Sequence, residues 1–440
     1  MDKKSTKGVT RRGFLKTAAA ATAAATVVGV TRPGYVAESG TLKVGLIGCG
    51  GRGRGAAGQA LRAGQVAGVP TQLVAVADVL RERSQGAKRE FAESPNKAVR
   101  ENTKISDDMA FDGPDAYKKL LAVPEINYVI LAAYPGFRPS HFEAAVAAKK
   151  QIFTEKPVGV DPVGIRQFMA AAKKSEEMGL SVVAGTQRRH QANYVNTVKM
   201  IHEGLIGDIM AGRVFWQGGP VINARERDPK WGDLEWQIRS WYAHLWLCGD
   251  NIVEQHVHNL DIANWVLKGH PVWASGNGGR AWKRRDAFLG NIWDNFSVDY
   301  EYKVGDRSVH IFSMSRHLDG SPGDVSEHFV GTKGESSGSD KGNGGLEWQE
   351  PYTQEHIHLI ESITGKGKKL NEGIQVAEST FTAILGRESA YQGRPLEWDK
   401  FLASDLSYFP KDLSFEAKIE ETPVAHPGAP RWWKVPMECL

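Results

Sequence analysis

The stretch LKVGLIGCGGRGRGAAGQALRAG, residues Leu42–Gly64, decides the fold. Its first residues form a short apolar run that predicts a buried strand, and the glycines that follow predict a tight turn into a helix. Gly48, Gly50 and Gly53 fit the pattern G-x-G-x-x-G. In that pattern the first glycine permits the turn, the second lets a pyrophosphate approach the backbone, and the third lets strand and helix pack closely. Arg52 lies inside the pattern and is a further candidate for cofactor contact.

Further apolar runs follow along the chain, and helical patterns separate them. The runs are Thr71–Asp78, Ile126–Ala133, Gln151–Pro157 and Leu180–Gln187, and the helical patterns are Ser140–Lys150 and Pro162–Gly179. Continuous Val/Ile/Ala runs are typical of parallel strands that are buried on both faces. Residues 41–160 are therefore predicted to form a doubly wound α/β domain of the Rossmann type, with the option that 161–187 completes its sheet.

The sequence pattern changes after about Gly185. Half-buried strands are predicted at 210–219, 295–304 and 307–316, and helices at 193–204 and 253–267. Alternation of this kind indicates a mixed α+β domain with an open, largely antiparallel sheet over residues 161–400. The run Gly331–Gly345 has almost no apolar side chains, so a mobile surface loop is expected there. Residues 401–440 are expected to be a C-terminal extension.

The N-terminal leader carries the basic charge of this 440-residue chain, whose formal net charge is +4. Residues 1–37 hold seven basic side chains and one acidic one, a net of +6, so the rest carries 4 − 6 = −2. This balance gives no support for a nucleic-acid partner. The leader combines TRRGFLK, Thr10–Lys16, with an alanine-rich apolar run and is similar to a twin-arginine export signal. We expect export to the periplasm by the twin-arginine machinery and no stable membrane span; a basic tail or membrane anchor is the alternative.

Asp78 ends the second apolar run, 25 residues after Gly53. An acid near this distance holds the ribose hydroxyls of the adenosine half of a dinucleotide. The carboxylate would repel a ribose 2′-phosphate, which favours NAD over NADP. Arg81 and Arg83 follow directly, and either could pair with that phosphate, so NADP stays open as the cofactor.

Three motifs downstream of the glycine turn carry a family resemblance. TEKPVG (Thr154–Gly159), GTQRR (Gly185–Arg189) and HEGLIGDI (His202–Ile209) occur in the order found in the Gfo/Idh/MocA family of glucose-fructose oxidoreductase and inositol dehydrogenase. The resemblance extends from Thr41 to about Lys400. It implies an N-terminal Rossmann domain, a C-terminal domain with an open sheet, and NAD(P)-dependent chemistry on sugars, cyclitols or related polyols.

The resemblance also implies catalytic residues. Lys156 would lie beside the nicotinamide and the reacting hydroxyl, where an ammonium can hydrogen-bond the substrate oxygen and stabilise a developing alkoxide. His258 would be the general base that takes the hydroxyl proton. The family has an aspartate four residues before this histidine; here Glu254 stands there, and its extra methylene puts its distance to the substrate in doubt.

Glu254, His258 and Asp261 lie in GDNIVEQHVHNLDIANW, Gly249–Trp265, at a spacing that places all three on one side of a helix. Such a set could also bind a metal ion, and His258 could be a buried histidine without a role in catalysis. Hydride transfer needs no metal, so none is expected. Cys49, Cys248 and Cys439 are far apart and odd in number, which supports neither a disulfide framework nor a cysteine zinc site.

Position and resemblance give further candidates. Cofactor contacts are expected from Tyr134, His141, Glu155 and Gln187, and substrate contacts from Arg239, Trp241, Tyr242, His244 and Asp261. The leading hypothesis is an exported oxidoreductase that holds NAD or NADP tightly and regenerates it with a second substrate. An NAD-dependent enzyme that cleaves glycosides by transient oxidation and elimination is the second hypothesis, and a noncatalytic binding protein is the third. A homo-oligomer formed through the open sheet is also expected.

Overall fold

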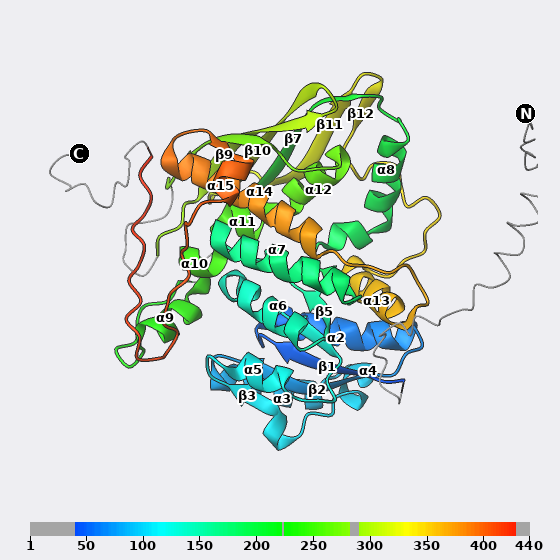
Figure 1. Cartoon of the computed structure of the whole chain (residues 1–440), viewed down its shortest axis with the longest axis vertical. Coiled ribbons are helices and arrows are strands. Elements are labelled where there is room, and N and C mark those ends of the chain that lie inside the picture. The colour runs from blue at the N-terminus through cyan, green and yellow to red at the C-terminus, as the bar shows by residue number, and fades with distance from the viewer. Residues whose placement is uncertain (1–39, 222–223, 282–289, 428–440) are drawn as a thin grey trace, which may run out of the picture. The chain divides into compact units, whose positions relative to one another are not determined.

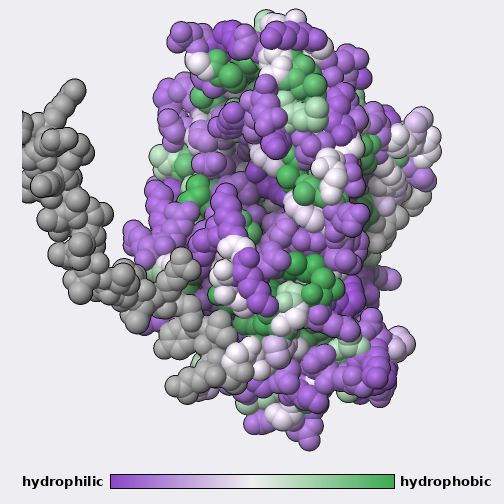
Figure 2. Space-filling model, turned by 90° about the vertical axis from the view of Figure 1, so that its right-hand side faces the viewer, coloured by the Kyte–Doolittle hydropathy of each residue, from purple (hydrophilic) through white to green (hydrophobic). Residues whose placement is uncertain are grey.

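The computed structural model describes residues 40–221, 224–281 and 290–427. The predicted leader and Cys439 lie outside the described residues. Two sheets organise the described chain, one built by its N-terminal part and one by its C-terminal part (Figure 1). The face in Figure 2 is mainly hydrophilic, with separate apolar patches. No helix of the described ranges is long and apolar enough to cross a bilayer.

The first sheet is the predicted parallel one. Its six strands have the order β3-β2-β1-β4-β5-β6, and every neighbouring pair is parallel. The strands are β1 (Leu42–Ile47), β2 (Thr71–Asp78), β3 (Ala110–Asp112), β4 (Tyr128–Leu131), β5 (Gln151–Thr154) and β6 (Val182–Ala184). The chain order reverses between β1 and β4, the position at which sheets of this type bind ligands. β6 lies within 161–187 and completes the sheet.

Helices cover both faces of this sheet, which explains the continuous apolar runs. They are α2 (Gly51–Val66), α3 (Arg81–Ala92), α4 (Lys97–Glu101), α5 (Ala116–Leu121), α6 (Arg138–Ala147) and α7 (Pro162–Glu177), with short 3-10 turns η1 (Asp107–Met109) and η2 (Pro135–Phe137). α7 begins with Pro162 after an N-cap, because the Asp161 carboxylate accepts a hydrogen bond from the Gly164 N–H at 2.7 Å. The Rossmann architecture predicted from the sequence is confirmed.

The second sheet is mixed and mostly antiparallel, as predicted. Its order is β12-β11-β7-β10-β9-β8-β13, and only the β7–β10 pair of these neighbours is parallel. The strands are β7 (Ile209–Gly218), β8 (Trp273–Gly279), β9 (Asn295–Val304), β10 (Arg307–His317), β11 (Asp324–Gly331), β12 (Gly334–Ser336) and β13 (Leu396–Glu397). The helices of this part are α8 (Ala192–His202), α9 (Asp233–Arg239), α10 (Leu245–Cys248), α11 (Asn251–Glu254), α12 (Val257–Leu267), α13 (Pro351–Thr364), α14 (Gly373–Gln392) and α15 (Trp398–Leu402), with 3-10 turns η3 (Gln187–His190) and η4 (Trp241–Ala243).

Two local predictions were wrong. The expected loop Gly331–Gly345 contains β12, because a turn between Gly331 and Gly334 folds the chain back onto β11. The predicted helix 253–267 is two helices, α11 and α12, separated at Gln255 and His256. At this break the Gln255 side chain accepts hydrogen bonds from the second sheet, from Trp216 Nε1 at 2.8 Å and from His317 Nε2 at 2.9 Å.

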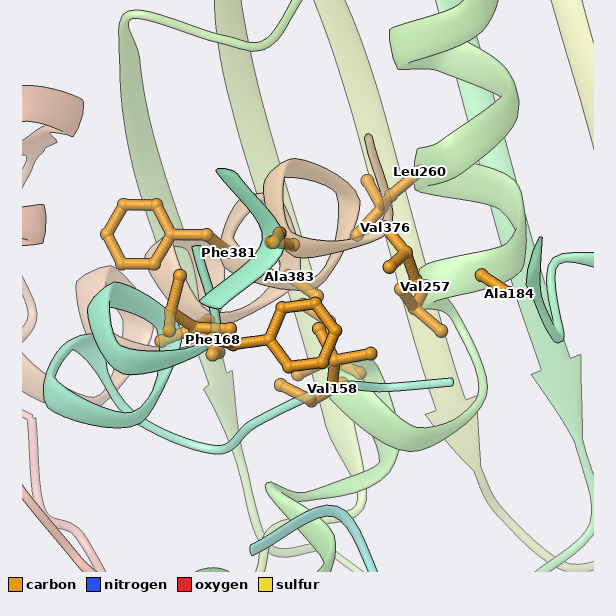
Figure 3. Close-up of a cluster of buried hydrophobic side chains, with 14 of the residues drawn as sticks. Val158, Phe168, Ala184, Val257, Leu260, Val376, Phe381 and Ala383 are labelled. Carbon is orange, nitrogen blue, oxygen red and sulfur yellow. The ribbon is translucent and has the colours of Figure 1, made fainter. Parts of the chain in front are cut away.

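A single hydrophobic core continues from the first sheet into the second part of the chain. Figure 3 shows side chains of α7, β6, α12 and α14 packed together, among them Val158, Phe168, Ala184, Val257, Leu260, Val376, Phe381 and Ala383. Each of these is fully buried. Burying one large side chain of this kind contributes about 1.5–3 kcal/mol. The shared core therefore fixes the loop after β5 next to α11 and α12.

Candidate active site

The glycine turn lies where β1 ends and α2 begins. Gly48 has a φ of +97°, and a Cβ there would lie 2.3 Å from the Ala133 nitrogen. A Cβ on Gly53 would lie 1.9 Å from the Gly48 carbonyl oxygen. At Gly50 nothing lies within 4 Å of the same position. The first and third glycines thus permit the turn and the close packing, and the second leaves space above the backbone.

This space belongs to a cleft with a volume of about 490 Å³. Gly50 precedes α2 in an extended conformation, and no side chain caps the helix. The free N–H groups of a helix N-terminus attract an anion such as a pyrophosphate. Lys156, Glu254 and His258 line the same cleft. The residues present therefore fit a dinucleotide whose pyrophosphate lies on the glycine turn.

Asp78 lines an adjoining cavity together with Gly48 and Gly50. Its carboxylate accepts hydrogen bonds from the N–H groups of Cys49 at 2.7 Å and Leu80 at 3.0 Å. Burial raises the pKa of Asp78, and the charge of nearby Arg83 opposes that shift. Of the two arginines named from the sequence, Arg83 lines this cavity, whereas Arg81 is exposed and lies 3.8 Å from Asp112.

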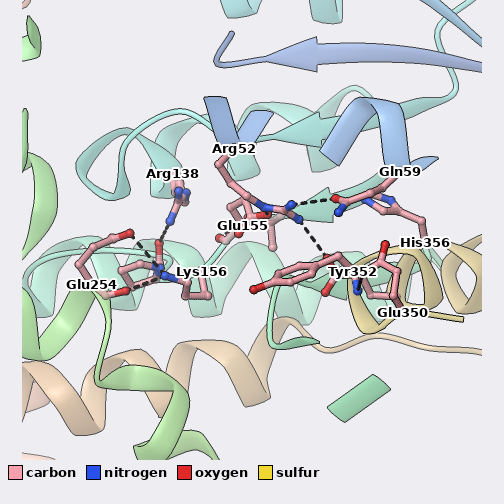
Figure 4. Close-up of polar contacts among 12 residues, drawn as sticks. Arg52, Gln59, Arg138, Glu155, Lys156, Glu254, Glu350, Tyr352 and His356 are labelled. Carbon is pink, nitrogen blue, oxygen red and sulfur yellow. Dashed lines mark hydrogen bonds and ion pairs between the residues drawn. The ribbon is translucent and has the colours of Figure 1, made fainter. Parts of the chain in front are cut away.

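Lys156 follows β5 and reaches the end of α11. Its Nζ donates to the main-chain oxygen of Glu254 at 2.6 Å and lies 3.4 Å from Glu254 Oε1 (Figure 4). Glu254 Oε2 is buried without a hydrogen-bond partner. Burial raises the pKa of Glu254, while Lys156 and Arg138 oppose the shift. The longer side chain that replaces the expected aspartate therefore spans the distance to Lys156.

His258 lies on the first turn of α12 and lines the cleft. Its ring stacks on Trp216 of β7, with 5.8 Å between ring centroids. Among the described residues, no hydrogen bond joins its ring nitrogens to another group. Burial, followed by the charge of Lys156, holds the pKa of His258 well below the ordinary value of 6.5. The imidazole is therefore neutral near pH 7, the form that accepts a proton.

Arg52 connects the glycine turn to residues far along the chain. Its Nε donates to Glu155 Oε1 at 2.5 Å, and a second nitrogen lies 3.2 Å from Glu355 of α13. The guanidinium also lies over the ring of Tyr352, 4.8 Å from its centroid. Figure 4 shows this group beside the Lys156 group, with Glu155 adjacent to Lys156 in the chain. Arg52 and Glu155, both predicted cofactor contacts, therefore line the cleft as an ion pair.

The other predicted cofactor residues also face these cavities. Tyr134 lines both, and its hydroxyl accepts a hydrogen bond from Arg83. His141 lines the cavity of Asp78 and stacks on Tyr117, and burial lowers its pKa to about 3. Gln187 lines the cleft with a buried Oε1 that has no hydrogen-bond partner.

The predicted substrate wall is only partly present. Trp241 lines the cleft and stacks on Tyr134, with ring centroids 4.7 Å apart. The other four residues do not line it, because each is engaged elsewhere. Arg239 pairs with Glu82 and Glu235, Tyr242 is buried and stacks on His317, His244 is buried against Trp236, and Asp261 is buried with Arg189. The helix break at Gln255 turns Asp261 away from Glu254.

Three polar cleft residues were missed by the sequence analysis: Arg54, Arg138 and Tyr352. Trp216, which stacks on His258, was missed as well. Trp216 and Tyr352 come from distant elements and carry no local signal. Arg138 is the first residue of α6 and stands in an otherwise apolar segment between β4 and that helix. A single charged residue in such a segment was therefore an available signal. No group of three metal-binding side chains occurs among the described residues.

Residues 42–183 match the model of the GFO_IDH_MocA family, described as "Oxidoreductase family, NAD-binding Rossmann fold". This part of the chain is thus similar to the NAD-binding Rossmann domain of that oxidoreductase family, in agreement with the predicted resemblance.

Particular relatives extend the similarity. An inositol 2-dehydrogenase of Gluconacetobacter diazotrophicus is 24% identical over 36% of this chain and 40% of its own length. A glycosyl hydrolase family 109 protein of Streptomyces coelicolor is 26% identical over 50% of this chain and 47% of its own. The chain thus spans half or less of the length of these two relatives. The solved scyllo-inositol dehydrogenase of Lactobacillus casei, with NAD(H) and scyllo-inositol bound, has the same fold, with a TM-score of 0.60, 17% identity and coverage of 82% and 99%.

Proposed function

We propose that this protein is an NAD(P)-dependent oxidoreductase that acts on a CH–OH group of a sugar, polyol or cyclitol. The observation that carries the proposal is a single cleft that joins the uncapped N-terminus of α2 to Lys156 and His258. One side of the cleft suits a dinucleotide, and the other holds a cation beside a neutral imidazole.

The bound nicotinamide would supply the hydride acceptor. Lys156 Nζ, held by Glu254, would donate a hydrogen bond to the substrate oxygen and stabilise its developing negative charge. His258 would accept the hydroxyl proton, because it lines the cleft and its imidazole is in the neutral form. Glu254 would hold Lys156 in position through its side-chain carboxylate.

The cofactor is proposed to be NAD, with NADP as the alternative, and to be tightly bound. An arm made of residues 224–243 supports tight binding, because it reaches from the second part of the chain to the cavity of Asp78. Ile238 lines that cavity, and Arg239 pairs with Glu82 of α3 at 2.6 Å. The C-terminal segment 405–427 lies along α9 (Figure 1), where the Ile419 oxygen accepts a hydrogen bond from Gln237.

Redox-assisted glycoside cleavage is the second candidate. The family 109 relative favours it by name. By resemblance, the glycosidase branch of the family has another residue in place of this lysine, so the intact Lys156 favours net oxidation.

Export and assembly complete the proposal. Export by the twin-arginine route rests on the sequence of Thr10–Lys16. A homo-oligomer is proposed to form through the second sheet. Large apolar side chains are 41–50% exposed on its strands, namely Met210, Phe312, Val325 and Val330. Size-exclusion chromatography with light scattering would test this part, and a monomer would contradict it.

The decisive experiment is to denature the purified protein with acid and assay the supernatant for NAD(H) and NADP(H). We expect release of a nicotinamide dinucleotide. Protein that contains none and binds none at saturating concentration would overturn the proposed function. Cofactor-loaded protein is then screened with polyols, sugars and glycosides. Reduction of the bound nicotinamide supports oxidation, whereas cleavage of a glycoside without net NADH supports the second candidate.

A further inference from the structure

We infer that the substrate carries a carboxylate and that Arg138 binds it. The inference rests on the proposed function and names a substrate class for the same cleft: sugar acids such as aldonates and uronates. Arg138 begins α6, which places its guanidinium among the groups that line the cleft.

The guanidinium of Arg138 is buried but incompletely satisfied. The side chain is 5% exposed. One terminal nitrogen, Nη1, donates to the main-chain oxygen of Pro157. Nε is buried without a partner, and among the described residues Nη2 has no hydrogen bond either. Two donors of a planar fork are therefore available, the arrangement that recognises a carboxylate.

Two other cations of the cleft, Arg52 and Lys156, differ from Arg138 in this respect. Arg52 has Glu155 as an ion-pair partner at 2.5 Å, and Lys156 has Glu254 at 3.4 Å. Among the described residues, no carboxylate lies within 4 Å of the Arg138 guanidinium. A buried cation without a paired anion is costly, and an anionic ligand would remove that cost.

The position of Arg138 favours the substrate over the cofactor as the source of the anion. Figure 4 places Arg138 with Lys156 and Glu254, while Arg52 lies farther along the group, between Glu155 and Gln59. The pyrophosphate site on the glycine turn has its own uncapped N–H groups. Two carboxylates, of Glu155 and Glu254, are close enough to interact electrostatically with Arg138. The negative charges of these two carboxylates disfavour a doubly charged phosphate beside Arg138. A singly charged carboxylate is therefore the ligand that fits this position.

The test uses full-length protein loaded with NADH and three ligands that differ only at C1: gluconate, sorbitol and sorbitol 1-phosphate. Binding is measured from the rise of the thermal unfolding midpoint as the concentration of each ligand is increased. We expect gluconate to bind about 10–150-fold more tightly than sorbitol, the range for hydrogen bonds to a charged group. Uronates and neutral hexoses form a second matched pair, and the rate of hydride transfer from each to the cofactor is measured with protein loaded with NAD.

Arg138→Met should remove the preference for the acids, Arg138→Lys should retain part of it, and NADH affinity should stay unchanged in both. Arg100→Met, which removes an exposed arginine outside the cleft, is the control. Equal binding of acid and neutral ligands by the wild type overturns the inference even if Arg138→Met fails to fold. A preference for the phosphate, or weaker NADH binding in Arg138→Lys, also overturns it. Acid binding that depends on Arg138, without hydride transfer from any ligand to NAD, would refute the proposed function alone.

Discussion

Residues 249–265 place the carboxylate of Glu254 in the cleft and that of Asp261 in the protein interior, and the two carboxylates differ in their hydrogen bonds. Glu254 faces the cleft and has a buried oxygen without a hydrogen-bond partner. Asp261, which lies in α12 one turn after its first residue, accepts hydrogen bonds from Arg189, Gln375 and Ser379 at 2.7–3.1 Å. Both carboxylates are largely buried, and both face a cation. The difference teaches that a carboxylate with a free lone pair beside a cavity is available for chemistry, whereas a saturated one stabilises the fold.

The strongest test of this contrast is Lys156→Ala, which removes the cation beside Glu254. We expect turnover to fall by about 10²–10⁴-fold, the usual contribution of a group that handles a proton in the transition state. Bound cofactor should remain, because the glycine turn is untouched. Steady-state kinetics and cofactor content measure the two effects, with the exposed Lys118→Ala as control. Near-normal turnover would exclude the proposed role of Lys156.

Asp261→Ala tests the interior half of this comparison, because it removes the buried carboxylate that pairs with Arg189. Arg189, whose side chain is 15% exposed, would lose its paired carboxylate. The expected loss is about 3–5 kcal/mol in the free energy of unfolding, as for other buried pairs that lose one partner. Denaturant unfolding measures it, and Asp299→Ala, at an exposed pair, should cost less than about 1 kcal/mol. Unchanged stability together with lost turnover would place Asp261 in the cleft instead.

Histidines of the same stretch provide a pH test. Burial lowers the pKa of His256 to about 3, and its Nε2 lies 2.7 Å from Ser313 Oγ. The unfolded chain binds a proton below about pH 6.5 and the folded chain does not, so this contribution to stability is present above pH 6.5 and is lost as pH falls toward 3. As the pH falls from 6.5 toward 3, the free energy of unfolding of the wild type, relative to that of His256→Asn, should fall by up to about 1.4 kcal/mol per pH unit. A difference that stays constant with pH would contradict the prediction.

The smallest expected effect concerns the rim of the cleft. Trp241→Ala removes the ring stacked on Tyr134, an arrangement worth about 0.5–1.5 kcal/mol. Bound cofactor should dissociate about 2–12-fold faster, since that energy converts to this range of rates. Stopped-flow measurement of cofactor release tests it, with the exposed Val66→Ala as control. An unchanged rate would show that the arm does not retain the cofactor.

The features that the sequence predicted correctly are those written in local patterns. Each apolar run became a strand of the first sheet, because burial on both faces demands apolar residues at successive positions. The backbone of Gly48 and Gly53 admits no side chain, which is why the glycine turn could be recognised. Lys156 was located from the family resemblance of TEKPVG, and it lies directly after β5.

The features that it missed depend on contacts between distant segments. The spacing of Glu254, His258 and Asp261 suggested one helix face, and only the hydrogen bonds of Gln255 to the second sheet explain the break. Tyr242 and His244 have the residue types of a sugar-binding wall, yet packing buries them. Tyr352 reaches the cleft because α13 packs beside α2, which no pattern around either helix predicts.

The parallel pairing of β7 with β10 has a consequence for how the molecule folds. The chain from Gly218 to Arg307 must close as one long loop before these strands can meet, and α11 and α12 lie inside that loop. Closing long loops costs entropy before any contact compensates for it, which slows folding. In the Rossmann sheet four of the five neighbouring strand pairs join residues 23–34 apart, and only β1–β4 joins residues 84 apart, so this sheet should form first. Glu254 and His258 would arrive last, so a folding intermediate should already bind nucleotide while it still lacks the groups that act on substrate.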